Sequence, residues 1–178
     1  LYYQPQYDSQ SGKLRGVEAL VRWQDESGKM ISPGVFIPIA EKSGMIVPIG
    51  AWVLEEGIEK YAEWREKYNC DMILSLNISA IQYKRPDFVS NLLELLEKYK
   101  VNPKDIELEI TESVLIDDFE QVVSKLRTLK EYGIKISLDD FGTGYSSLSY
   151  LKGLPIDTLK IDKSFIDTVT EDKSTQVI

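Results

Sequence analysis

Apolar positions along the chain alternate between the two-residue period of strands and the wider spacing of amphipathic helices. Strand patterns cover residues 14–21, 71–77, 106–110, 134–138 and 156–161. Helical patterns cover about 32–44, 51–68, 86–101 and 118–132, and we expect Pro38 to kink or shorten the first of these. This alternation is typical of a parallel sheet with crossover helices, and predicts an α/β fold with a single domain over residues 1–178.

Composition restricts the class of protein. The 178 residues are 43% hydrophobic, enough for one good core, and no apolar run reaches the roughly 20 residues of a membrane span. A single cysteine, Cys70, excludes an internal disulfide framework and fits a reducing compartment, so we expect a cytoplasmic location, whether free or as the cytoplasmic part of a membrane-anchored parent protein. The net charge of −8 argues against a DNA or RNA polymer as partner.

The chain contains no histidine, which excludes several kinds of active site. Ser-His-Asp and Cys-His catalysis and histidine-ligated zinc are all ruled out. Asp140-Phe141-Gly142 matches the Asp-Phe-Gly triplet of protein kinases, but a chain without histidine cannot contain the His-Arg-Asp catalytic loop of a kinase. Any metal must therefore be held by oxygen ligands, which makes Mg²⁺, Mn²⁺ or Ca²⁺ the candidates.

Two adjacent carboxylates, Asp139 and Asp140, follow the strand pattern at 134–138 and precede a glycine-punctuated loop. Neighbouring carboxylates repel each other unless a cation neutralises them, which favours a divalent-metal site at the strand end. A capped turn is the alternative, because Asp and Gly are ordinary loop residues. On this motif alone the two interpretations stay open.

Polar residues also mark the ends of the other strand patterns. Glu18 lies on the first, Asn77 ends the second, Glu109 lies near the end of the third, and Lys160 lies on the last. Strand parity places Asn77 with Ser75, and Glu109 with Glu107, on the face opposite the apolar positions. Polar groups at the carboxyl ends of successive parallel strands are how a (β/α)₈ barrel builds its active site.

The ordered motifs resemble those of the EAL domain family. They are Tyr3-Gln4-Pro5, Glu18-Ala19-Leu20, Val21-Arg22-Trp23, Leu76-Asn77-Ile78-Ser79, Glu109-Ile110-Thr111-Glu112, Asp139-Asp140-Phe141-Gly142-Thr143-Gly144 and Leu159-Lys160-Ile161-Asp162. The resemblance implies a cyclic di-GMP phosphodiesterase that yields linear pGpG. It also implies a modified (β/α)₈ TIM-type barrel with an antiparallel first strand, and a divalent-metal requirement met by Mg²⁺ or Mn²⁺, with two ions.

The resemblance further implies roles for individual residues. The ligands of one metal would be Glu18, Asn77, Glu109 and Asp139, while Asp139 and Asp140 would contribute to a second. Lys160 would orient the attacking water, and Glu112 would fasten the loop 141–147, through which a homodimer would couple to the metals. The expected substrate contacts are Gln4, Leu20, Arg22 and Asp162.

The chain is shorter than a whole barrel, which typically takes roughly 250 residues. The family's later Glu-Gly-Val-Glu segment, with a further metal ligand, is absent, so we expect an incomplete domain that lacks its last strand-helix units and the start of its first strand. Three functions stay open: an active phosphodiesterase, a non-hydrolysing cyclic di-GMP receptor, and a regulatory module of a multidomain parent. Such a parent would carry a sensor or diguanylate cyclase domain.

Overall fold

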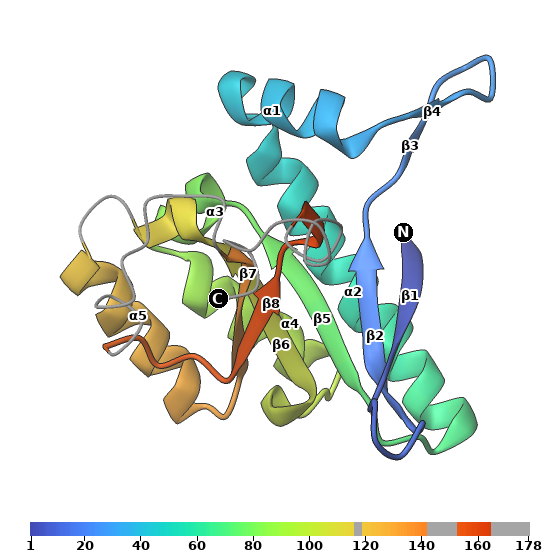
Figure 1. The fold of residues 1–178 in the computed structure, drawn as a ribbon, viewed down its shortest axis with the longest axis vertical. Coiled ribbons are helices and arrows are strands. Elements are labelled where there is room, and N and C mark those ends of the chain that lie inside the picture. Colours follow the sequence, from blue (N-terminus) through green and yellow to red (C-terminus); the bar gives the residue numbers. More distant parts are fainter. Residues whose placement is uncertain (116–118, 142–152, 165–178) are drawn as a thin grey trace, which may run out of the picture.

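The computed structural model describes residues 1–115, 119–141 and 153–164, which form a curled six-stranded sheet with helices packed against it and a separate two-stranded sheet (Figure 1). The elements are β1 (Tyr2–Tyr7), β2 (Leu14–Leu20), β3 (Trp23–Gln24), β4 (Met30–Ile31), α1 (Pro33–Ser43), α2 (Ile46–Tyr68), β5 (Ile73–Ile78), α3 (Ala80–Lys84), α4 (Phe88–Lys98), η1 (Pro103–Asp105), β6 (Ile106–Thr111), η2 (Glu112–Leu115), α5 (Phe119–Glu131), β7 (Lys135–Phe141) and β8 (Thr158–Ile161).

The main sheet has the strand order β1-β2-β5-β6-β7-β8. β1 is antiparallel to β2, and every later neighbouring pair is parallel. A tight turn makes the antiparallel pair possible: Asp8 Oδ1 accepts the Ser11 N–H at 2.7 Å, and Gly12 takes a left-handed φ of 66°. The expected antiparallel first strand is confirmed.

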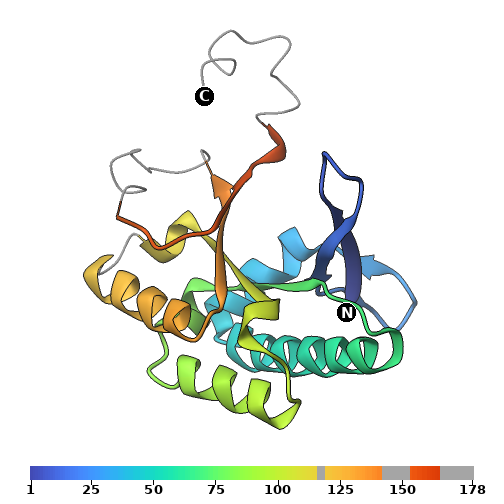
Figure 2. The ribbon, with the colours of Figure 1, turned by 90° about the horizontal axis from the view of Figure 1, so that it is seen from below.

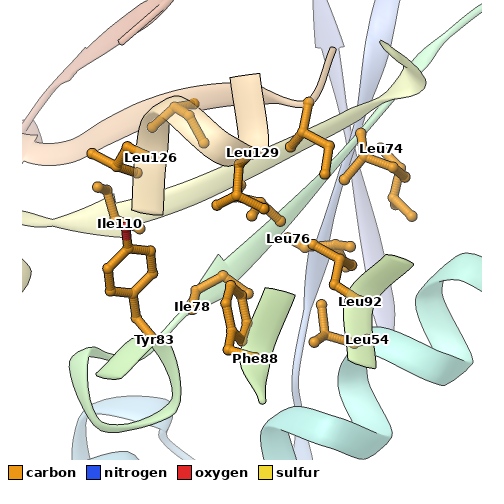
Figure 3. Packing of buried hydrophobic residues seen from close by; sticks show 14 of the residues in the cluster. Leu54, Leu74, Leu76, Ile78, Tyr83, Phe88, Leu92, Ile110, Leu126 and Leu129 are labelled. Carbon is orange, nitrogen blue, oxygen red and sulfur yellow. The ribbon is translucent and has the colours of Figure 1, made fainter. Parts of the chain in front are cut away.

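Helices α2, α4 and α5 lie along the outer side of the curled sheet (Figure 2). The core forms between them and the outward side chains of the strands, among them Leu74, Leu76 and Ile110, which are fully buried with Leu126 of α5 (Figure 3). Burying each such side chain stabilises the fold by about 1.5–3 kcal/mol relative to leaving it exposed. The outer face of the sheet therefore supplies the stability, and the inner face is left for polar groups.

Polar side chains do occupy the inner face, as strand parity predicts. Ser75, Glu107 and Ser137 alternate with the apolar core residues along β5, β6 and β7 and are almost fully buried. In the β5–β6 register Ser75 lies opposite Glu107, and Asn77 opposite Glu109. Consecutive strands therefore bring their predicted site residues to the same edge of the sheet.

Several predicted boundaries were wrong. α2 begins at Ile46 rather than near residue 51, because Pro48 falls in the first turn, where a missing N–H costs little. α1 runs over Pro33–Ser43, close to the prediction, so Pro38 does not shorten it. β7 continues to Phe141, which places Asp139 and Asp140 inside the strand rather than after it. The short elements β3, β4 and α3 were not predicted. The helical turn expected near residue 148 lies outside the described residues.

Within the described ranges, no single helix is both long and apolar enough to cross a membrane. Helices α1 and α2 taken together are long and apolar enough, but the chain bends by 120° between them.

Candidate active site at the carboxyl edge of the sheet

The ammonium group of Lys160, on β8, lies among three carboxylates from three other strands. Its Nζ donates to Glu109 Oε2 at 2.5 Å, to Asp139 Oδ2 at 2.9 Å and to Glu18 Oε2 at 3.3 Å. These acids come from β6, β7 and β2, so residues more than a hundred positions apart in the sequence meet at one point. The structure thus brings together four of the predicted site residues.

Asn77 joins the same cluster through Glu18. Its Nδ2 donates to Glu18 Oε1 at 2.9 Å, and β5 places it beside Glu109 in the strand register. The amide oxygen is left to act as a neutral ligand or acceptor. All four residues predicted to hold the first metal ion therefore lie together.

Burial and charge shift the ionisation of this cluster. The Glu109 side chain has no exposed surface, and burial, with repulsion from Glu18 and Asp139, raises its pKa although Lys160 donates to it. Burial opposes the charged form of Lys160 too, but its hydrogen bonds to Glu109 and Asp139 outweigh that effect and raise its pKa. Among the described residues, Glu109 Oε1 has no hydrogen-bond partner although it is buried. The cluster therefore holds more negative charge than one lysine compensates.

Asp140 has an unusual backbone. Its φ is 53°, in the left-handed region that non-glycine residues seldom adopt, and its N–H donates to Asp139 Oδ1 at 2.9 Å. The β7–β8 register is irregular between Leu138 and Phe141, at this same point. Burial, followed by the charges of Asp139 and Asp162, raises the pKa of Asp140. This carboxylate pair is therefore held at an irregularity in the strand and not in a relaxed turn.

The donor set suits a hard divalent cation. It consists of carboxylate and amide oxygens, and Glu109 Oε1 is a buried acceptor with no donor among the described residues. In the conformation described, no three His, Cys, Asp or Glu side chains within the described ranges are arranged as a metal site. The Lys160 ammonium explains this, because the three carboxylates converge on it. The residues fit the chemistry of Mg²⁺ or Mn²⁺, with Lys160 moved off the carboxylates.

A cavity of about 370 Å³ opens beside the cluster. Glu18, Asn77, Glu109 and Asp140 line it. Apolar side chains of two helices line it too: Pro33 and Ile37 of α1 and Ile46, Ile49 and Val53 of α2. Such a combination of an apolar wall and a few convergent polar groups is typical of a site for a small organic ligand.

Two of the predicted substrate contacts, Leu20 and Arg22, also line this cavity. The Arg22 guanidinium donates to the Val21 carbonyl at 2.9 Å and lies 5.9 Å from the centre of the Tyr2 ring, which leaves further N–H groups for a ligand. Gln4 is exposed on β1 and pairs with Glu18 in the register, so it lies next to the cluster but not on the cavity wall.

The last two predicted site residues lie at the margin of the cluster. Asp162 follows β8 and accepts the Ser164 N–H at 2.9 Å. Glu112 begins η2, is buried, and its charge contributes to the raised pKa of Asp140. The loop that Glu112 was expected to fasten, and through which dimerisation was expected, lies mostly outside the described residues.

The sequence analysis missed a second polar group on the inner face, one layer below the cluster. The Arg15 guanidinium donates two hydrogen bonds to the Glu107 carboxylate, of 2.7 and 3.0 Å, and Thr158 Oγ1 donates to the same carboxylate at 2.9 Å. Strand parity singled out Glu107, but Arg15 could not be found that way. Gln6 pairs with Gly16 and Tyr7 with Leu14, so Arg15 is an extra residue in the β1–β2 ladder.

Comparisons with known proteins agree with this geometry. The EAL domain family model matches residues 1–178. Signaling protein YkoW of Bacillus subtilis is 44% identical over 99% of this chain, and the bifunctional diguanylate cyclase/cyclic di-GMP phosphodiesterase MucR of Pseudomonas aeruginosa is 40% identical over 100% of it. The chain spans only 22% and 26% of the length of these two curated relatives.

Solved structures extend the comparison to the fold. A structure of the PaMucR phosphodiesterase in complex with c-di-GMP superposes with a TM-score of 0.92 at 40% identity, and the match covers 98% of this chain and 71% of that one. The predicted fold class, a modified TIM-type barrel that is incomplete in this chain, is confirmed by this likeness.

Proposed function

The chain belongs to the EAL domain family, and we propose that it forms the part of a phosphodiesterase that hydrolyses cyclic di-GMP to linear pGpG. The observation that carries the proposal is the convergence of Glu18, Glu109 and Asp139 on Lys160, within 2.5–3.3 Å, at the edge of the cavity. A structural or purely packing role would not require a buried, unsatisfied carboxylate at that edge.

The relatives supply the substrate class. MucR carries cyclic di-GMP phosphodiesterase in its name, and its solved phosphodiesterase is a complex with c-di-GMP. A cavity lined by apolar side chains of α1 and α2 and by a polar cluster suits a ligand that combines flat bases with phosphates. No nucleic-acid polymer is required, which agrees with the net charge of −8.

The metal ligands in this proposal are those that the structure brings together. Glu18, Asn77, Glu109 and Asp139, which lie together, would hold one Mg²⁺ or Mn²⁺ ion, and Asp139 and Asp140 would contribute to a second. When bound, such ions polarise the phosphate and supply hydroxide at neutral pH. They also reverse the sign of the local field, which allows an acidic protein to bind an anionic substrate.

The other residues position the reactants. A lysine ammonium is positively charged at neutral pH, so the N–H groups of Lys160 orient the attacking water and neutralise charge on the phosphate. Arg22 makes a forked phosphate contact, since it lines the cavity and its guanidinium has N–H groups beyond the one that donates to Val21. Gln4, Leu20 and Asp162 complete the substrate contacts, and Glu112 fastens the loop 141–147 for a homodimer that couples to the metal site.

The parent protein, in this proposal, is a cytoplasmic signalling protein or the cytoplasmic part of a membrane-anchored one. MucR is named as both a cyclase and a phosphodiesterase, which supports a sensor or diguanylate cyclase domain in the same polypeptide here. The chain covers about a quarter of such relatives, so there is room in proteins of that size for several further domains.

The test is to incubate the whole protein with cyclic di-GMP and Mg²⁺ or Mn²⁺ and to separate the nucleotides by chromatography. Loss of cyclic di-GMP with matching growth of pGpG supports the proposal. Tight binding with complete recovery of cyclic di-GMP would instead support the non-hydrolysing receptor, and neither binding nor turnover would leave the regulatory module.

A further inference from the structure

The inner face of the sheet carries a second polar layer directly beneath the candidate site. Three of its members lie two residues before a site residue: Ser75 before Asn77, Glu107 before Glu109, and Thr158 before Lys160. Side chains two residues apart on a strand point to the same face. The lower layer is thus in a position to control where the upper layer sits.

Hydrogen bonds in this layer connect strands that are not neighbours in the sheet. Glu107 of β6 accepts from Arg15 of β2 at 2.7 and 3.0 Å and from Thr158 of β8 at 2.9 Å. β5 separates the first pair of strands and β7 separates the second. Ser75 Oγ also donates to Glu107 at 2.9 Å, and Arg15 donates to Gln6 of β1 at 2.9 Å. The network therefore crosses the barrel interior instead of following the ladder.

The start of strand β8 is tied to the rest of the sheet at two adjacent residues. The Asp157 N–H donates to the Ile136 carbonyl of β7 at 2.8 Å and its carboxylate accepts the Ile136 N–H at 2.8 Å, while Thr158 bonds to Glu107 across the interior. Strand β8 has only four residues, its register with β7 is irregular, and its alternate side chains Leu159 and Ile161 are 41% and 58% exposed. Asp157 thus holds the start of β8 against β7, but outer packing does little to fix how far the β8 side chains reach into the interior. The Thr158 hydroxyl donates to Glu107 and accepts from Arg15 at 3.4 Å, and so links β8 to the buried interior below Lys160.

We propose that Thr158 is a positioning residue for Lys160. Arg15 holds the Glu107 carboxylate, and the hydrogen bond from Thr158 to that carboxylate sets how far β8 lies toward the barrel interior. The position of β8 in turn sets where the Lys160 ammonium lies among its three carboxylates. The catalytic consequence rests on the proposed function, in which Lys160 orients the attacking water. The structural consequence does not, because the place of the ammonium is measurable in a protein that hydrolyses nothing.

The experiment compares Thr158→Val, which keeps the branched shape and removes the hydroxyl, with Thr158→Ser, which keeps the hydroxyl. Thr128→Val is the matched control, because Thr128 is exposed on α5 and its hydroxyl donates within its own helix, to the Ser124 carbonyl. Glu107 keeps its bonds from Arg15 and Ser75 in every variant, so the fold should survive. All variants are made in the whole protein and assayed at a temperature at which circular dichroism shows each fully folded.

Two quantities are measured. One is kcat and KM for cyclic di-GMP with Mn²⁺, and the other is the rate at which acetic anhydride labels Lys160 in the metal-free protein, in chelator, resolved by mass spectrometry. In Thr158→Val we expect kcat to fall by about 10- to 10²-fold at unchanged KM, the scale of a small misplacement of a reacting group. We expect Lys160 to label several-fold faster there, since it leaves its carboxylates. Thr158→Ser and Thr128→Val should match the parent in both.

The outcomes separate this inference from the proposed function. If the parent protein hydrolyses nothing, the proposed function fails, while faster labelling of Lys160 in Thr158→Val still supports the positioning role. An unchanged labelling rate in Thr158→Val overturns the positioning role, whether or not kcat falls. A general rise in labelling of the other lysines also overturns it, because the hydroxyl would then be stabilising the fold as a whole.

Discussion

Lys160 Nζ lies 2.5 Å from Glu109 Oε2, and this contact joins strands that are separated in the sheet by β7. It places a partly buried ammonium against a carboxylate that has no exposed side-chain surface. Removing one partner of such a pair leaves an uncompensated charge, which is far more costly than the pair itself is stabilising. The pair is therefore the electrostatic centre of the candidate site.

Replacing Lys160 with methionine should destabilise the protein in the presence of chelator. Three carboxylates would lose their shared cation, and we expect the free energy of unfolding to fall by about 1–3 kcal/mol, between the values for exposed and buried pairs. Adding Mn²⁺ should restore much of the loss, because it replaces the missing positive charge. Urea unfolding measures both effects, with Lys29→Met, an exposed lysine in the β3–β4 turn, as control. Equal stability of the two variants in chelator would contradict this assignment.

Replacing Glu18 or Asp139 with alanine should remove hydrolysis while leaving the fold intact. Each variant loses a proposed metal ligand, so activity should drop by orders of magnitude. The melting temperature should change little, because neither side chain belongs to the apolar core. Relief of carboxylate repulsion is expected to raise stability slightly in chelator. Glu26→Ala, an exposed acid in the β3–β4 turn, is the control and should behave like the parent. Near-normal kcat in either site variant would show that its carboxylate is not a ligand.

Removing divalent cations should abolish turnover reversibly. The oxygen donor set favours Mg²⁺ and Mn²⁺, and the larger, looser coordination of Ca²⁺ should restore little activity because it spaces the reacting oxygens badly. Initial rates measured after EDTA treatment, dialysis and addition of each metal test this order. Undiminished turnover in excess EDTA would refute metal dependence.

Binding of Mn²⁺ should weaken as the pH falls through neutrality. Burial raises the pKa of Glu109 to about 7, so at lower pH a proton occupies the carboxylate that the metal requires. Protons and Mn²⁺ compete for this carboxylate. The affinity for Mn²⁺ is therefore highest above the pKa of Glu109 and is lost below it, and binding near neutrality releases a proton. Calorimetry from about pH 8 down to about pH 6, in buffers of different ionisation enthalpy, measures affinity and proton release together. Constant affinity over this range would argue against Glu109 as a ligand.

The residues that the sequence predicted best are those governed by short-range periodicity. The two-residue period placed Ser75 and Glu107 on the inner face, and the strand ends placed Asn77 and Glu109 at one edge. The antiparallel β1 and the roles of individual residues came from the resemblance to the EAL family, because no periodicity determines strand direction.

The features that the sequence did not predict depend on irregular backbone or on distant parts of the chain. A bulge turns Arg15 toward Glu107 against the parity of its strand, and nothing in the local pattern signals it. Asp139 and Asp140 look like loop residues, yet β7 continues through them because β8 pairs with Phe141. The contact of Lys160 with Glu18 depends on the closing curvature of the whole sheet.

Product analysis in labelled water tests the central claim most directly. The whole protein is incubated with cyclic di-GMP and Mn²⁺ in H₂¹⁸O, beside a Glu109→Gln variant that removes only the charge of the buried carboxylate, and the nucleotides are identified by mass spectrometry. The account predicts pGpG that carries a single ¹⁸O on its terminal phosphate from the parent, and intact cyclic di-GMP from the variant. Cyclic di-GMP recovered unchanged from the parent, or equal turnover by the variant, would contradict it.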